Sequence, residues 1–174
     1  MEMHFRQATF QDVDSIIELV RQRIEWMDAQ GLHQWNETDY FGRYPREYWE
    51  NRVGSFLVGE ENGKVVVAVA LYTEDVRWTR DGQYTGSLSG DAYYIHHLVT
   101  SPNAKGAGVA MMRYVEEYAL EHDIHLLRLD SATHNKVLEN YYHQLGYVAC
   151  GTCHHGKYQG ILREKPLISI APSV

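Results

Sequence analysis

The segment from Tyr94 to Glu121 limits the fold more than any other part of the chain, because it predicts a strand, a glycine loop and a helix in direct succession. The loop carries Gly106 and Gly108, and the helix is predicted over 108–121. The start of a helix has free backbone N–H groups and a partial positive charge, and glycine lets a phosphate approach the main chain. This succession therefore predicts an anion site and a ligand that carries phosphate.

Two other phosphate-binding motifs have a similar outline, and the spacing argues against both. A Walker A loop places four residues between its glycines and ends in Gly-Lys-Ser/Thr, whereas one residue separates Gly106 from Gly108 and Val109 follows. A dinucleotide fingerprint expects an acid about 20 residues beyond the loop, which Asp130 supplies. Its third glycine position is Met111, however, and the chain after Asp130 is too short to complete a doubly wound sheet. A nicotinamide-binding redox domain is therefore disfavoured.

The loop instead resembles that of the Gcn5-related N-acetyltransferase (GNAT) family, which reads Arg or Gln, two residues, Gly, one residue, then Gly or Ala. Here the corresponding residues run from Lys105 to Ala110, with Gly108 at the first glycine position and the family-like Pro102 ahead of them. Lys105 replaces the usual Arg or Gln, which keeps a positive charge but loses the planar fork of a guanidinium. Main-chain donors still carry the binding of a pyrophosphate.

A second motif strengthens this resemblance. Residues 135–147 match the family pattern of an Asn, a short helix that carries Tyr, and Leu-Gly-Phe, with Tyr147 in place of the Phe. The opening residues 5–9 and Asp12 also look like the family. The resemblance therefore covers nearly the whole chain, and we expect one N-acetyltransferase domain over residues 1–174.

The fold that this resemblance implies is a mixed α/β (α+β) fold, with a mostly antiparallel central sheet flanked by helices on both faces. Periodicity along the chain predicts the same order of elements, β, αα, βββ, α, β, α, ββ. Polar segments 32–44 and 75–90 are expected to hold no regular element. The expected strands are 3–8, 55–60, 64–73, 92–100, 125–130, 147–154 and 157–165, and the expected helices are 11–30, 45–51, 108–121 and 136–144. Asn62-Gly63 predicts a hairpin turn between strands 55–60 and 64–73, and Gly31 is expected just past the end of helix 11–30.

The resemblance implies acetyl-CoA as a cosubstrate and requires no metal or prosthetic group. In the family, the strand before the loop offers backbone groups to the pantetheine arm, and the loop holds the pyrophosphate. The residues that match are Leu98, Val99 and Thr100 on the strand, and Lys105, Gly106, Ala107, Gly108, Val109 and Ala110 in the loop. Asn135 corresponds to a family residue near the cofactor arm, and it could equally cap the following helix, alone or in addition.

The motif places Tyr142 as the acid that serves the departing thiolate, and it would also lie against the cofactor. The alternative is a tyrosine that only packs in the core. The base is not fixed in the family, but it commonly lies on the strand before the loop. Alternation puts Tyr94 and His96 on one face of that strand and His97 on the other, and we choose His96 because a neutral imidazole accepts a proton near neutral pH. A structural histidine, or binding of an already neutral amine, stays open.

The acceptor amine is expected to contact the N-terminal helices and segment 75–90, which the cofactor motifs leave unused. Aromatic and acidic side chains are dense there and suit an amine with an apolar body, although aromatic residues at helical spacing are more often core. The sequence does not identify the acceptor, which is the amine of a small molecule or of a protein. These side chains are Trp26, Trp35, Tyr40, Tyr44, Tyr48, Trp49, Glu25, Asp28, Glu37 and Asp39.

Cys150 and Cys153 precede His154 with the spacing of a haem-attachment or metal motif. They fall within the expected strand 147–154, where residues three apart point to opposite faces. We therefore expect two reduced cysteines on opposite faces of an ordinary strand.

Composition excludes several partners. The net charge is −7 and basic residues do not cluster, which disfavours nucleic acid and mildly favours a cationic or amine partner. No run of 18 apolar residues predicts a membrane span, and the polar N-terminus does not resemble a signal peptide, so a cytoplasmic location is expected. The main alternative function is a non-catalytic acyl-CoA-binding or sensor module, which would need neither Tyr142 nor a base. The oligomeric state, a homodimer included, stays open.

Overall fold

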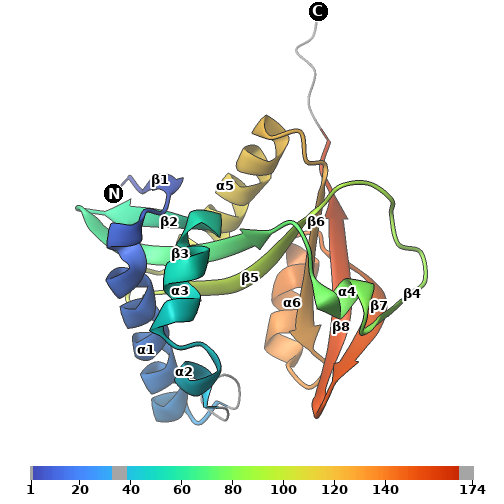
Figure 1. The fold of residues 1–174 in the computed structure, drawn as a ribbon, viewed down its shortest axis with the longest axis horizontal. Helices are drawn as coiled ribbons and strands as arrows, with labels where there is room; N and C mark the ends of the chain where they lie inside the picture. Colours follow the sequence, from blue (N-terminus) through green and yellow to red (C-terminus); the bar gives the residue numbers. More distant parts are fainter. Residues whose placement is uncertain (1, 33–38, 169–174) are drawn as a thin grey trace, which may run out of the picture. The chain divides into compact units, whose positions relative to one another are not determined.

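The computed structural model describes residues 2–32 and 39–168 (Figure 1). The chain forms two compact units. The first unit comprises Met1–Leu71 and His97–Tyr114, and the second comprises Tyr72–His96 and Val115–Val174. Eight strands are hydrogen-bonded in the order β1-β2-β3-β5-β6-β8-β7-β4. Strand β5 (Tyr93–Thr100) belongs to both units, because the boundary falls within it. The predicted mixed α/β class with a mostly antiparallel sheet is confirmed.

The first unit is built on an antiparallel arrangement of β1 (His4–Gln7), β2 (Phe56–Glu61) and β3 (Lys64–Tyr72). The predicted hairpin between β2 and β3 is present, with Asn62 and Gly63 at φ 53° and 75° in its turn. Positive φ at both turn residues is the requirement that Asn-Gly meets best.

The helices of the first unit follow a short 3-10 turn η1 (Phe10–Asp12). Helix α1 (Val13–Gln30) ends at Gly31, whose φ of 68° terminates the helix in the left-handed conformation that its sequence predicts. Helices α2 (Tyr40–Arg43) and α3 (Arg46–Arg52) follow, and the 3-10 turn η3 (Val53–Ser55) leads into β2. The expectation that segment 32–44 holds no regular element is therefore wrong at α2, which Asp39 caps. Helix α5 (Ala107–Glu121) begins in this unit and ends in the second.

The second unit contains the C-terminal strands. Strand β6 (Leu126–Ala132) is parallel to β5 and antiparallel to β8 (Tyr158–Pro166), which pairs in turn with β7 (Val148–His155). Strand β4 (Gly82–Tyr84) is antiparallel to β7. Helix α6 (Lys136–Gln144) connects β6 to β7.

The expectation that segment 75–90 holds no regular element is wrong. It contains helix α4 (Val76–Thr79) and strand β4, and Asp75 caps the helix. Trp78 on α4 is only 1% exposed and packs in a core with Tyr94 and Leu162. One large apolar side chain among polar neighbours therefore anchors this segment in the second unit, although the segment has no apolar period.

The expectation that Cys150 and Cys153 face opposite sides of the strand is also wrong. Both thiols are buried in the same core cluster, because the pairing of β7 with β8 shifts between Ala149 and Gly151. A β-bulge at Cys150 adds one residue to the strand and resets its alternation. Burial raises the pKa of each thiol to about 11, so both are inert, protonated core residues at neutral pH.

Tyr147 offers a test of this packing, because it stands where the family motif has Phe. Its ring is 1% exposed, and its hydroxyl has no hydrogen-bond partner in the described part of the chain. A buried hydroxyl without a partner costs about 1 kcal/mol or more. Tyr147→Phe should therefore raise the free energy of unfolding by about 1 kcal/mol in urea titrations. Tyr141→Phe, at a half-buried neighbour, should change it little, and a loss of stability in Tyr147→Phe would reveal a bonded hydroxyl.

Candidate active site

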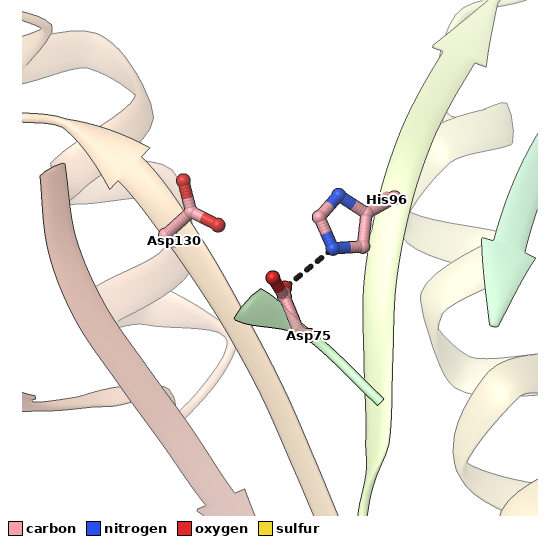
Figure 2. A group of neighbouring side chains, drawn as sticks. All are labelled: Asp75, His96 and Asp130. Atoms are coloured by element: carbon pink, nitrogen blue, oxygen red, sulfur yellow. Dashed lines mark hydrogen bonds and ion pairs between the residues drawn. The ribbon is translucent and has the colours of Figure 1, made fainter. Parts of the chain in front are cut away.

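A cluster of titratable side chains lies in the second unit, where Asp75, His96 and Asp130 point toward one another (Figure 2). They come from the N-cap of α4, from β5 and from β6. One ligand atom of each residue lies within 4.8 Å of those of the other two. The predicted base His96 therefore lies beside two acids that sequence reasoning did not identify.

Asp75 is held rigidly. Its Oδ1 accepts a hydrogen bond of 2.9 Å from the backbone N–H of Arg77, which caps α4, and its Oδ2 lies 2.5 Å from Nε2 of His96. The Asp75 side chain is 3% exposed, whereas that of His96 is 26% exposed. The imidazole is thus held at Nε2 by a buried carboxyl group, while its side chain is partly exposed.

Asp130 accepts a hydrogen bond of 2.5 Å from the hydroxyl of Tyr158 on β8. Burial raises the pKa of the Asp130 carboxyl above its ordinary value, while the Tyr158 hydrogen bond and the nearby His96 and Arg77 oppose that change. Burial and the neighbouring Asp130 also raise the pKa of Tyr158, which keeps its hydroxyl a donor. The guanidinium of Arg77 lies 4.6 Å from the centre of the Tyr158 ring.

The residue types of this cluster could hold a metal ion, but its geometry favours a hydrogen bond. Two ligands about 2.0 Å from a tetrahedral ion lie about 3.3 Å apart. The 2.5 Å between Asp75 and His96 is shorter than that and is the separation of a hydrogen-bonded pair. Asp75 and His96 are therefore partners of one another in this arrangement.

Tyr142, the predicted acid, lies on α6 in the same unit and is half-buried. Burial raises the pKa of its phenol well above the ordinary value, and the neighbouring Tyr141 and Asp130 raise it further. The hydroxyl is therefore protonated at neutral pH and suited to donating a hydrogen bond.

The second predicted motif has a clear local structure. Asn135 caps α6, because its Oδ1 accepts a hydrogen bond of 3.0 Å from the N–H of Leu138, and its predicted capping role is confirmed. After the helix, Gly146 has φ 94°, and its N–H binds the carbonyl of His143. A left-handed residue at this point requires glycine, which explains the Gly of the Leu-Gly-Tyr sequence. Contact of Asn135 with a cofactor stays a prediction.

The predicted phosphate loop lies in the first unit. Helix α5 starts at Ala107, directly after Gly106, whose φ is 81°. A Cβ atom at Gly106 would meet nothing within 4 Å, and Lys105 beside it is exposed. Gly108 and Val109 lie in the first turn of α5, where backbone N–H groups have no acceptor within the helix.

The strand residues predicted to bind the pantetheine arm also belong to the first unit. Leu98 and Thr100 are half-buried and Val99 is buried at the end of β5. Arg23 on α1 donates hydrogen bonds of 2.9 and 2.5 Å to the carbonyl and hydroxyl of Thr100. Arg23 thus fixes this strand end, a role that its position in an amphipathic helix did not reveal.

Part of the predicted acceptor surface packs around His97. Its Nδ1 lies 2.6 Å from the hydroxyl of Tyr40, and its Nε2 lies 2.8 Å from that of Tyr48. Trp49 is 1% exposed and its ring lies 5.1 Å from that of His97. Tyr40 and Trp49 are therefore core residues, the alternative that the sequence left open, and Tyr48 is half-buried beside them. Trp35 and Glu37 lie outside the described residues.

The backbone at His97 is unusual, because its φ is 54°. A strand cannot keep its regular alternation through a left-handed residue, so the faces predicted from sequence do not extend past His97. The two histidines consequently belong to different surroundings: His96 contacts Asp75 in the second unit, and His97 contacts Tyr40 and Tyr48 in the first.

The predicted residues are thus distributed over both units. His96, Asn135 and Tyr142 belong to the second unit, with Asp75 and Asp130. The residues expected to bind the cofactor, from Leu98 to Ala110, belong to the first. Among the described residues, no helix is long and apolar enough to cross a membrane.

Comparisons with known proteins agree with this architecture. A sequence model of the acetyltransferase (GNAT) family matches residues 21–147, whereas a comparison with curated protein sequences gave no match. The fold resembles that of a GNAT-family acetyltransferase from Streptococcus agalactiae, with 19% identity, 96% of each chain covered and a TM-score of 0.77. It also resembles a GNAT-family acetyltransferase from Listeria monocytogenes, with 22% identity, 96% of each chain covered and a TM-score of 0.77. The PaiA N-acetyltransferase from Thermoplasma acidophilum, solved with coenzyme A, is similar as well. The identity is 17%, the match covers 95% of this chain and 99% of that one, and the TM-score is 0.70.

The family match covers more than half of the sequence, and the structural similarity extends over nearly all of it. The chain therefore belongs to the acetyltransferase (GNAT) family. Its activity is accordingly an N-acetyl transfer that depends on acetyl-CoA. The resemblance drawn from the glycine loop and from residues 135–147 is confirmed.

Proposed function

We propose that this enzyme acetylates a primary amine of a small molecule or a protein, with His96 as the base and Tyr142 as the acid. The observation that carries the proposal is the hydrogen bond between His96 and Asp75 in the unit that also contains Tyr142. A partly exposed imidazole with one nitrogen held by a carboxyl group is an arrangement that suits a general base.

The reaction needs little more than alignment and two proton-handling groups, because the thioester is already activated. The neutral amine attacks the thioester carbonyl and forms the C–N bond, and His96 takes the extra proton from nitrogen. The C–S bond then breaks, and the electron pair leaves on sulfur as a thiolate. Tyr142 stabilises that thiolate by donating its hydroxyl proton into a hydrogen bond, for which a phenol that stays protonated is well suited.

The cosubstrate contacts proposed here follow the family motifs residue by residue. Leu98, Val99 and Thr100 would contact the pantetheine arm, and the loop from Lys105 to Ala110 would hold the pyrophosphate at the start of α5. The helix dipole and the N–H groups of its first turn favour an anion at that place. Asn135 would keep its capping bond and offer its amide N–H group to the cofactor arm.

The remaining expectations are proposals of the same kind. A metal-free reaction, an amine acceptor, a cytoplasmic location and the absence of nucleic acid and membrane partners rest on the sequence. No observation favours the alternative of a non-catalytic acyl-CoA-binding module. Such a module would need neither a hydrogen-bonded His96 nor a protonated Tyr142.

A screen of amines tests the function directly. With acetyl-CoA and a panel of small amines and lysine peptides, release of free thiol should depend on the acceptor and exceed the rate without any acceptor. The acetylated product should be identified by mass, which separates transfer from simple thioester hydrolysis. Binding of acetyl-CoA without turnover of any amine across the panel would favour the binding module instead.

A further inference from the structure

Asp75 has no role in the family motifs from which the site was predicted, yet it is buried and hydrogen-bonded to His96. It lies at the N-cap of α4, its side chain is 3% exposed, and each carboxyl oxygen has a defined partner. Burying a carboxylate costs free energy unless its oxygens are hydrogen-bonded, so the buried side chain of Asp75 needs its bonds to the two groups it contacts.

The hydrogen bond determines which nitrogen of His96 carries a proton. An ionised carboxylate can only accept, so Nε2 of His96 must donate to Oδ2 of Asp75. In the neutral imidazole the proton then lies on Nε2, and the lone pair lies on Nδ1. The same bond holds the ring in one orientation, because the carboxyl group is itself fixed by the N–H of Arg77.

We propose that Asp75 is the positioning residue of this acetyltransferase: it fixes the ring and tautomer of His96 so that Nδ1 takes the proton of the acceptor amine. This inference rests on the proposed role of His96 as the base. During transfer the amine proton moves to Nδ1, the negative charge of Asp75 stabilises the imidazolium that forms, and that proton later passes to solvent. Asp75 itself keeps its charge throughout.

The charges around His96 decide how strongly Asp75 acts. Asp130 on β6 is a second acid, but its carboxyl oxygen is engaged by Tyr158, and burial raises its pKa. Asp75 is therefore the acid whose bond to the imidazole is in place. The titratable groups beside His96 are Asp75 from the N-cap of α4, Asp130 from β6 and Tyr72 from the end of β3. The charged or titratable groups that act on Asp130 in turn are Tyr158 from β8, Arg77 from α4 and Tyr142 from α6.

The test is Asp75→Asn, with Asp123→Asn as its matched control. Asn caps a helix as well as Asp does, so α4 should persist and the thermal midpoint should change little. The amide loses the charge and can offer an N–H to His96, which favours the wrong tautomer. We expect kcat to fall by about 10²-fold near pH 7 while the KM for acetyl-CoA is nearly kept. Asp123 pairs with His125 at 3.0 Å on the surface, so Asp123→Asn removes the charge of another Asp–His pair and should leave the rate unchanged.

Two readouts separate positioning from a structural role. The acid limb of the pH–rate profile should move to lower pH in Asp75→Asn, since no carboxylate stabilises the protonated base. The position of this limb does not depend on how much of the protein is folded, so a loss of folding alone would not move it. In a His96→Ala background, Asp75→Asn should lower the rate by less than about 3-fold, because Asp75 acts through His96. An equal loss in both backgrounds, or an unmoved limb, would overturn the inference.

The outcomes also separate this inference from the role of His96. A wild-type rate in His96→Ala would show that His96 is not the base and would overturn the inference as well. A slow His96→Ala with a wild-type rate and profile in Asp75→Asn would overturn the positioning role alone. Activity that EDTA removes and zinc restores would assign Asp75, His96 and Asp130 to a metal site, and would overturn it as well.

Discussion

Gly108→Asp should abolish the binding of acetyl-CoA while the chain stays folded. Gly108 lies in the first turn of α5, at the first glycine position of the family motif. The substitution adds a side chain and a negative charge where we propose that the pyrophosphate approaches the main chain, so the same helix dipole that favours the ligand would be neutralised. An acidic residue in the first turn is compatible with the helix, so the expected loss lies in affinity rather than in folding.

Calorimetric titration with CoA measures this effect, and we expect the affinity to fall by at least about 100-fold. Gly54→Asp is the matched control, because it adds the same charge at an exposed position of η3 where the backbone φ is not positive and a Cβ atom meets nothing within 4 Å. The wild-type protein should bind CoA and show no affinity for NADH. Normal CoA affinity in Gly108→Asp would place the phosphate site elsewhere, and binding of NADH without CoA would contradict the proposed ligand.

The fold was predictable wherever a local signal determines the backbone. Asn62-Gly63 predicted the β2–β3 turn, Gly31 predicted the end of α1, and helix α6 was expected with the bounds that it has. In each case a residue meets a conformational requirement of its own position, such as a positive φ or a capping bond. Signals of this kind need no knowledge of the tertiary structure.

The errors arose where non-local packing determines the outcome. The bulge at Cys150 resets the alternation of β7, and nothing in the local sequence distinguishes it from regular strand. Trp78 anchors the short elements α4 and β4 in the core of the second unit, against residues more than 70 positions away in sequence. His97 has a left-handed backbone although it is not glycine, and two tyrosine hydroxyls hold its ring. A local pattern cannot predict contacts of this range.

The candidate site divides in the same way. His96 was located by its place on the strand before the loop, and Tyr142 by its place in the second motif. Asp75 was missed because it is 21 positions from His96 and lies in a segment that was expected to be irregular. Asp130 was weighed only as a dinucleotide-binding acid, since its contact with Tyr158 on β8 is also non-local. Sequence motifs therefore identify the groups that act on the substrate better than the groups that hold them in place.

Tyr142→Phe should lower kcat by about 10²-fold while the affinity for acetyl-CoA is nearly kept. The substitution deletes one hydroxyl and leaves the ring, whose packing against the Tyr141 and Tyr147 rings at 5.2 and 6.0 Å should persist. The hydroxyl is protonated at neutral pH, because burial raises its pKa, so its loss removes a hydrogen-bond donor and no charge. A donor to the departing thiolate acts mainly in the transition state, which is why the effect should fall on kcat.

Steady-state kinetics with an active acceptor, beside calorimetric binding of CoA, measures the two quantities separately. Tyr141→Phe deletes a hydroxyl from the adjacent residue of the same helix and should leave kcat within about 2-fold of the wild type, since Tyr141 is expected only to pack. Equal kcat in Tyr142→Phe and the wild type would make Tyr142 a packing residue, and another group would then serve the thiolate. A loss of CoA affinity with an unchanged kcat would instead mean that the hydroxyl binds the cofactor equally in the ground state and the transition state, since only an interaction that strengthens in the transition state lowers kcat.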